Sequence, residues 1–228
     1  MQSAPVRERS LYVDVLRVIA CFLVIVNHTN SRVFQHSDPS QAIWYLSMGY
    51  YYLAKTAVPL FVMISGICLL GKDDSPRRAL GRFLRMLAVT VLFSYLYYCY
   101  HHDWSFVYAT SPRAFLESLW DRPATDAFWY LYMYLGLLLC MPLMQRLVKA
   151  LSKGWLGYFL LVSLGVLGAW PLAQHYFPSL KAPMFFDLPM FGLFLGLLAA
   201  GHYLRVYVKT TRRGVLIASL LLPASLVA

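Results

Sequence analysis

Apolar and polar positions follow one another in long blocks along this chain. Mostly apolar blocks, many close to the roughly 20 residues that cross a bilayer as a helix, are separated by short polar connections. We predict blocks at residues 11–29, 43–70, 86–100, 127–143, 154–173, 184–203 and 214–228. The third is short unless Arg85 and His101 snorkel from its ends, and the seventh stops in mid-span. The predicted fold is therefore an all-α, polytopic transmembrane helical bundle, with about six full spans plus the start of a seventh.

Composition supports a membrane protein with one domain over residues 1–228. Hydrophobic residues make up 60% of the 228 positions, charged residues only 13%, and the mean hydropathy is +0.57. The formal charge of +10 does not indicate a nucleic-acid partner, because the basic residues fall between the apolar blocks. The four cysteines lie in different blocks and are predicted to be reduced packing residues. Without zinc-ligand spacing, we predict no metal site.

The distribution of Lys and Arg predicts the orientation. The amino-terminal segment and every second connection after it carry 14 of the 20 basic residues. Because cytoplasmic loops are enriched in Lys and Arg, the amino terminus is predicted to be cytoplasmic. Arg17 then lies near the inner mouth of the first span, His28 lies toward the outer face, and residues 101–126 form an outer loop.

The first block carries the strongest candidate chemistry. Arg17 and His28 are eleven residues apart, about three helical turns, so both side chains point the same way, roughly 16 Å apart along the axis. We expect a cation at one mouth of this face and an imidazole deep inside. Arg17 as a snorkelling anchor and His28 as a hydrogen-bonded bundle residue remain alternatives. Asp14, three residues before Arg17, is positioned to orient the guanidinium.

The second block contains two further features. Lys55 interrupts it near the centre and is expected to face the bundle interior, a water-filled cleft or an acidic partner. Residues 59–66, PLFVMISG, combine a helix breaker, the hydroxyl of Ser65 and a glycine. This segment is either a packing kink or a bend that exposes backbone groups to a ligand.

Basic and imidazole side chains mark the two ends of the third block. Arg78, Arg82 and Arg85 share one helical face, which fits either positive-inside topology or a phosphate-rich ligand. His101 and His102 are adjacent and so face apart on a helix, which favours membrane-interface residues over a metal pair.

Several of these motifs together resemble the acyltransferase-three family of membrane-bound O-acyltransferases. The resemblance begins with Tyr12, Asp14, Leu16 and Arg17, followed after ten residues by His28. It continues through PLFVMISG at residues 59–66, the arginines up to Arg85, FWYL at 128–131 and MPL at 141–143. Among family members, the chain is most similar to bacterial enzymes that O-acetylate surface polysaccharides. Members usually have about ten spans, so the resemblance implies that roughly the last third is missing.

One position departs from the family pattern. The family often places a histidine ahead of the fourth landmark, whereas this chain has Ala127 there, preceded by Asp126. This position therefore supplies no second imidazole, and Asp126 or His101 is expected to replace part of its role.

The resemblance implies an inner-membrane O-acyltransferase, most simply an O-acetyltransferase. Acetyl-CoA or another acyl-CoA is the expected co-substrate, with no tightly bound cofactor, and the expected acceptor is an envelope glycan or lipid-linked sugar. Arg17, Arg82 and Arg85 are expected to hold the phosphates of coenzyme A. His28 is the expected general base, and Ser65 and Asn27 are expected oxyanion donors. An exporter of envelope intermediates that uses Lys55, Arg17 and His28 is the contrasting alternative, and an inactive truncated membrane partner is a third.

Overall fold

The computed structural model describes residues 10–29, 33–104, 111–121, 123–166, 173–177, 179 and 189–227, and these contain helices and no strands. Backbone contacts divide the chain into two compact units. Unit 1 comprises residues 1–67 and 200–228, and unit 2 comprises residues 68–199. The boundaries fall inside two helices, α3 and α10, so each of these helices contributes to both units. The single domain over residues 1–228 stays a prediction.

Among the residues that the structure describes, four helical stretches are long and apolar enough to cross a membrane. They run over Leu11–His36, Ala42–Leu69, Pro76–His101 and Asp126–Ala150. The predicted all-α membrane fold is thus confirmed, and the first, second and fourth predicted blocks coincide with three of these stretches. The predicted total of spans stays a prediction, because the fifth and sixth blocks lie partly outside the described residues.

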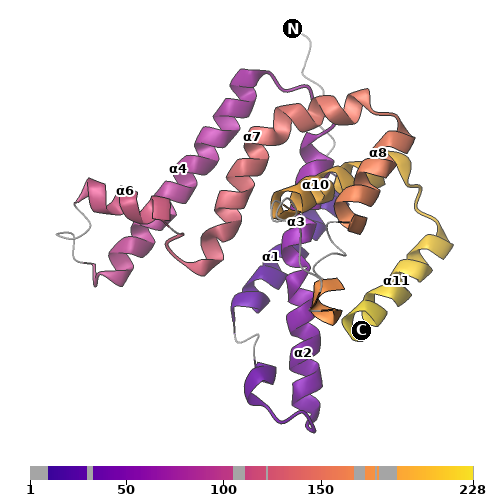
Figure 1. Ribbon diagram of the computed structural model, residues 1–228, viewed down its shortest axis with the longest axis horizontal. Helices are drawn as coiled ribbons and strands as arrows, with labels where there is room; N and C mark the ends of the chain where they lie inside the picture. Colours follow the sequence, from indigo (N-terminus) through magenta and orange to yellow (C-terminus); the bar gives the residue numbers. More distant parts are fainter. Residues whose placement is uncertain are drawn as a thin grey trace. The chain divides into compact units, whose positions relative to one another are not determined.

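The amino-terminal part of unit 1 contains the α-helices α1, α2 and most of α3 (Figure 1). Helix α1, Leu11–His28, packs against α2, Ala42–Lys55, through a face that includes Val13, Ala20 and Leu23. A short 3-10 helix, η1 (Val33–His36), also contacts α2.

The second apolar block is two helices rather than one. α2 ends at Lys55 and α3, Ala57–Leu69, begins two residues later. Pro59 explains the break, because proline has no N–H to donate to the carbonyl four residues earlier. The break lies at Thr56, just before residues 59–66, and the choice between a packing kink and a ligand-facing bend for that segment stays a prediction. Lys55 is exposed at the end of α2, with Nζ 4.5 Å from the centre of the Tyr51 ring, so an aromatic face lies against its ammonium group.

The third predicted block, residues 86–100, is shorter than the helix that the structure shows. Helix α4 spans Pro76–His101, 26 residues, and so begins ten residues before the predicted start. Ser75 caps it by accepting a hydrogen bond from the Arg78 N–H, and Pro76 occupies the first turn, where proline is tolerated. The arginines are therefore part of the helix, which is long enough to cross a bilayer without snorkelling at both ends.

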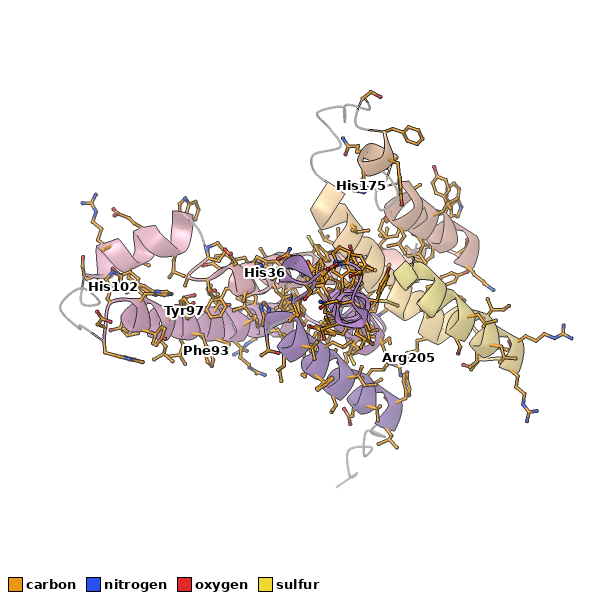
Figure 2. All side chains as sticks on the ribbon, turned by 90° about the horizontal axis from the view of Figure 1, so that it is seen from below. His36, Phe93, Tyr97, His102, His175 and Arg205 are labelled. Atoms are coloured by element: carbon orange, nitrogen blue, oxygen red, sulfur yellow. The ribbon has the colours of Figure 1, made fainter. Side chains whose placement is uncertain are left out.

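Unit 2 is organised around the antiparallel pair of α4 and α7, Trp129–Ala150, which lie side by side in Figure 1. α7 carries Pro142 in its interior and bends along its length, as expected where proline removes a helical hydrogen bond. The predicted outer loop contains a further helix, α6 (Pro112–Asp121), which packs on the end of α4. Figure 2 shows His102 at this end, with Tyr97 and Phe93 along α4.

The later segments are helical as well. α8, Lys153–Leu160, continues into the π-helical η3, Leu161–Val166. α10 covers Pro189–Tyr207 and α11 covers Arg212–Val227. Within unit 1, α11 contacts α2.

Candidate functional site

The structure places Arg17 and His28 on one uninterrupted helix. α1 runs from Leu11 to His28 without a break, so the eleven-residue separation corresponds to about 16 Å of rise and a rotation within about 20° of three full turns. The two side chains therefore share one side of α1, beside the packed face. This is the relationship that the spacing predicts.

Arg17 is oriented by a local ion pair. Its Nη1 lies 2.8 Å from Oδ1 of Asp14, one turn earlier, and 47% of the arginine side chain is exposed. The predicted role of Asp14 as an orienting residue is confirmed. A guanidinium group has five N–H donors in a planar fork, a geometry that suits a phosphate.

His28 is the last residue of α1 and is exposed, so the expectation of a deeply enclosed imidazole is wrong for the described structure. The helix ends there because Thr29 takes an extended conformation. Thr29 closes the last turn through its N–H and its Oγ1, which donate to the Ile25 carbonyl at 2.9 and 2.8 Å. Asn27, the preceding residue, is half-buried. The helix end thus fixes the backbone that carries Asn27 and His28.

Ser65 lies on α3, in the same unit as Arg17, Asn27 and His28. It is half-buried, and its Oγ donates to the Phe61 carbonyl one turn earlier, at 3.0 Å. Such a bond to the helix backbone satisfies the hydroxyl proton internally. To donate to an oxyanion, Ser65 must exchange this bond for one to the reacting oxygen. Its predicted role stays a prediction.

Two residues that sequence reasoning passed over hold α10 against α3 within unit 1. A Cβ on Gly201 would lie 2.1 Å from the Met63 carbonyl oxygen, so only glycine allows this backbone approach. Four residues later, Arg205 Nη1 donates to the Ile67 carbonyl at 2.7 Å. This carbonyl belongs to the last turn of α3, where no intrahelical partner is available. The only sequence signal was the run of small residues before Gly201.

The arginine face of α4 is present as predicted, since Arg78, Arg82 and Arg85 lie on one continuous helix. Arg82 is engaged by a carboxylate, because its Nη2 pairs with Oδ2 of Asp74. Arg78 and Arg85 are exposed. In unit 2, the structure therefore separates one arginine held by the protein from two that face outward.

Asp74 is the centre of a buried polar cluster that the sequence did not reveal. Its side chain is 5% exposed, and Oδ2 accepts hydrogen bonds from Arg82 and from Nε2 of Gln145. Gln145 is 4% exposed and also donates to the Leu69 carbonyl at 2.9 Å. The cluster thus ties the end of α3, the start of α4 and α7 together.

The electrostatics of this cluster favour the ionised carboxylate. Burial alone raises the pKa of Asp74, but the hydrogen bonds from Arg82 and Gln145, with the charges of Arg82 and Lys72, outweigh it and lower the pKa below its usual value. A cavity of about 180 Å³ adjoins the cluster, lined in part by Asp73, Asp74 and Gln145. Lys149 bridges to Asp73 beside it.

The far end of α4 collects the residues proposed to replace the missing family histidine. The His101 ring lies 4.5 Å from that of Tyr97, and Tyr97 lies 5.9 Å from Phe128, two residues after Asp126. The His102 ring packs at a tilt of 33° against that of Tyr98, and its Nδ1 lies 2.9 Å from the Tyr98 carbonyl oxygen. His101 and Asp126 are both exposed near this end. The aromatic surroundings match the predicted membrane-interface role of the two histidines.

Possible metal ligands are dispersed. Among the residues that the structure describes, no three His, Cys, Asp or Glu side chains gather closely enough to hold a metal ion. The four cysteines are all free thiols.

Long apolar helices, with a guanidinium and an imidazole on one side of the first span, define a helical membrane protein. A family model described as "Acyltransferase domain" matches residues 10–228. The chain belongs to this acyltransferase-three family and is a membrane acyltransferase. No curated protein and no solved structure matches it significantly.

Proposed function

We propose that this membrane acyltransferase transfers an acyl group, most simply acetyl, from acyl-CoA to a hydroxyl of a cell-envelope glycan or lipid-linked sugar. The observation that carries the proposal is the placement of Arg17 and His28 on one side of the continuous helix α1, in a chain of this family. The alternation of basic connections supports a bacterial inner-membrane protein with a cytoplasmic amino terminus.

The donor binds through its phosphates. Arg17 is near the amino-terminal end of α1, and its guanidinium, oriented by Asp14, offers bidentate hydrogen bonds to a phosphate. The pantetheine arm then runs along α1, and an extended arm covers the separation of about 16 Å to His28. Phosphate binding by Arg82 and Arg85 stays a prediction. The ion pair with Asp74 favours Arg85 over Arg82 for that role.

The chemical step is a direct acyl transfer. The acceptor hydroxyl oxygen attacks the thioester carbonyl while His28 takes its proton; the new C–O bond forms, the C–S bond breaks and coenzyme A leaves as the thiolate. The proton on His28 is returned to the thiolate or to solvent. A positioned general base of this kind contributes about 10²–10⁴-fold to the rate.

The oxyanion of the tetrahedral intermediate requires donors. Asn27 adjoins His28 on the same helix, and its side-chain amide is the nearest candidate in sequence. Ser65 on α3 is the second, once its hydroxyl leaves the Phe61 carbonyl.

The experiment that tests this function uses vesicles containing the chain, with acetyl-CoA labelled in the acetyl group. We expect label to appear in a membrane glycan or lipid-linked sugar, with one free coenzyme A thiol released per acetyl ester. Transport of an unmodified envelope intermediate, with acetyl-CoA left intact, would contradict the proposal and favour an exporter.

A further inference from the structure

An apolar groove runs along α4 in unit 2. It has a volume of about 510 Å³ and is lined by hydrocarbon side chains of α4 between Leu84 and Leu92. The rings of Tyr95 and Phe115 close one end. Phe115 comes from α6 and packs edge-on against Tyr95, with ring centres 5.3 Å apart. The groove is therefore formed by a membrane-spanning helix and capped by the helix that packs on its end.

The length of the groove suits one leaflet of a bilayer. Leu84 and Tyr95 are eleven residues apart on α4, which is about 16 Å. The hydrocarbon core of a bilayer is about 30 Å thick, so one leaflet contributes about 15 Å. Because α4 is long and apolar enough to span the membrane, its exposed apolar face meets acyl chains rather than water.

The open end of the groove is basic. Arg77, Gly81, Leu84 and Ala88 follow one another at intervals of four, three and four residues, so they form one stripe on α4. Arg77 is exposed, and a Cβ on Gly81 would meet nothing within 4 Å, so the surface between Arg77 and Leu84 is open. An anionic group can approach the backbone there, directly below the apolar groove.

We infer that this stripe binds one anionic phospholipid of the bilayer. An acyl chain occupies the groove from Leu84 to Tyr95, with its end under Phe115, and the phosphate lies over Gly81 against the Arg77 guanidinium. Arginine binds phosphate through charged hydrogen bonds, while the groove holds the acyl chain by van der Waals packing, because lipid tails are as apolar as the side chains that line it. This proposal rests on residues of α4 and α6 and does not depend on the acyl-transfer chemistry proposed for α1.

Native mass spectrometry of the purified chain, titrated with phosphatidylglycerol in detergent, tests this site. We expect one phospholipid to bind tightly. Ala88→Trp fills the middle of the groove and is expected to weaken binding about tenfold, because the indole ring occupies the space in which the acyl chain packs. Arg77→Gln is expected to weaken phosphatidylglycerol several-fold and to leave phosphatidylcholine nearly unchanged, because only the former carries a net negative charge.

Two control variants separate this site from general lipid adhesion. Leu139→Trp changes an exposed apolar residue on α7, and Arg78→Gln removes the neighbouring arginine, which points about 100° away on α4. Both are expected to bind phosphatidylglycerol like the unmodified chain. Equal binding by Ala88→Trp and Leu139→Trp, with both folded by circular dichroism, would overturn the proposal. A second result would also overturn the proposal: palmitoyl-CoA displaces the lipid from the unmodified chain, and this displacement is lost in Ala88→Trp. The groove would then bind an acyl donor.

Discussion

Asp74 and Gln145, 71 residues apart in the chain, share a hydrogen bond that joins the start of the α4 segment to the far half of α7. Gln145 uses its second amide proton for the Leu69 carbonyl, and Asp74 uses the same carboxylate oxygen for Arg82. A carboxylate taken out of water is costly unless it is paired and hydrogen-bonded, and here both conditions are met. The cluster therefore stabilises unit 2 by holding α7 against the segment that precedes α4.

Removing the charge of Asp74 is expected to destabilise the chain. Asp74→Asn replaces the charged acceptor of Arg82 by a neutral amide and places this amide beside the amide of Gln145. The free energy of unfolding is expected to fall by about 1–3 kcal/mol. Thermal unfolding in detergent, followed by circular dichroism, measures the change. Asp73→Asn is the matched control, because Asp73 is 96% exposed and its surface ion pair with Lys149 is worth at most about 1 kcal/mol. Equal losses of stability in Asp74→Asn and Asp73→Asn would contradict a stabilising role for the buried cluster.

The same carboxylate predicts a pH dependence of stability. Its pKa is lowered in the folded chain, so the stabilisation is fully present above the pKa of an unfolded aspartate, about 3.9, and is lost as the pH falls through the lower folded value. Unfolding temperatures recorded between pH 7 and pH 3 are expected to fall less steeply in Asp74→Asn than in the unmodified chain at the acidic end. Parallel curves would show that Asp74 does not carry this linkage.

The contact between Gly201 and Met63 predicts opposite effects for two glycine substitutions in unit 1. Gly201→Ala forces the α10 segment away from the Met63 carbonyl and is expected to cost about 1–3 kcal/mol. Gly49→Ala on α2 meets open space and is expected to stabilise the helix by roughly 0.5–1 kcal/mol. Chemical or thermal unfolding in the same detergent compares the two. A neutral Gly201→Ala would mean that α10 and α3 do not approach this closely.

Substitution of Ser65 distinguishes a structural role of this residue from a catalytic one. Because its hydroxyl donates to the carbonyl of Phe61 in its own helix, a bond that adds little to helix stability, Ser65→Ala is expected to change the unfolding free energy by less than about 0.5 kcal/mol. If Ser65 donates to the oxyanion, the same substitution lowers kcat about 10²–10³-fold. Initial rates of acetyl transfer at saturating acetyl-CoA decide between these roles, and an unchanged kcat would remove Ser65 from the site.

Local pattern predicted much of this structure, and distant polar contacts account for most of what it missed. Hydropathy predicted the membrane helices, Pro59 marked the second block as irregular close to the break that the structure shows, and the Arg17–His28 spacing predicted their common side of α1. These features depend on residues within a few turns of one another.

The misses have a physical cause as well. No sequence signal near Gln145 predicts that its amide bonds to Asp74, because that contact depends on how α4 and α7 pack. α6 was missed because its ten residues are too short and too polar to register as a span. Its local signals, Ser111 as a cap and an Arg113–Glu117 pair at 2.8 Å, are nevertheless those of a helix.

The most direct test of the account is the rate of acetyl transfer from acetyl-CoA by the chain in lipid vesicles, measured for His28→Ala against the unmodified protein. With His28 as general base, kcat is expected to fall about 10²–10⁴-fold while KM for acetyl-CoA, which reflects phosphate binding at Arg17, stays nearly constant. Transfer that continues undiminished in His28→Ala would contradict the central claim that α1 carries the proton acceptor.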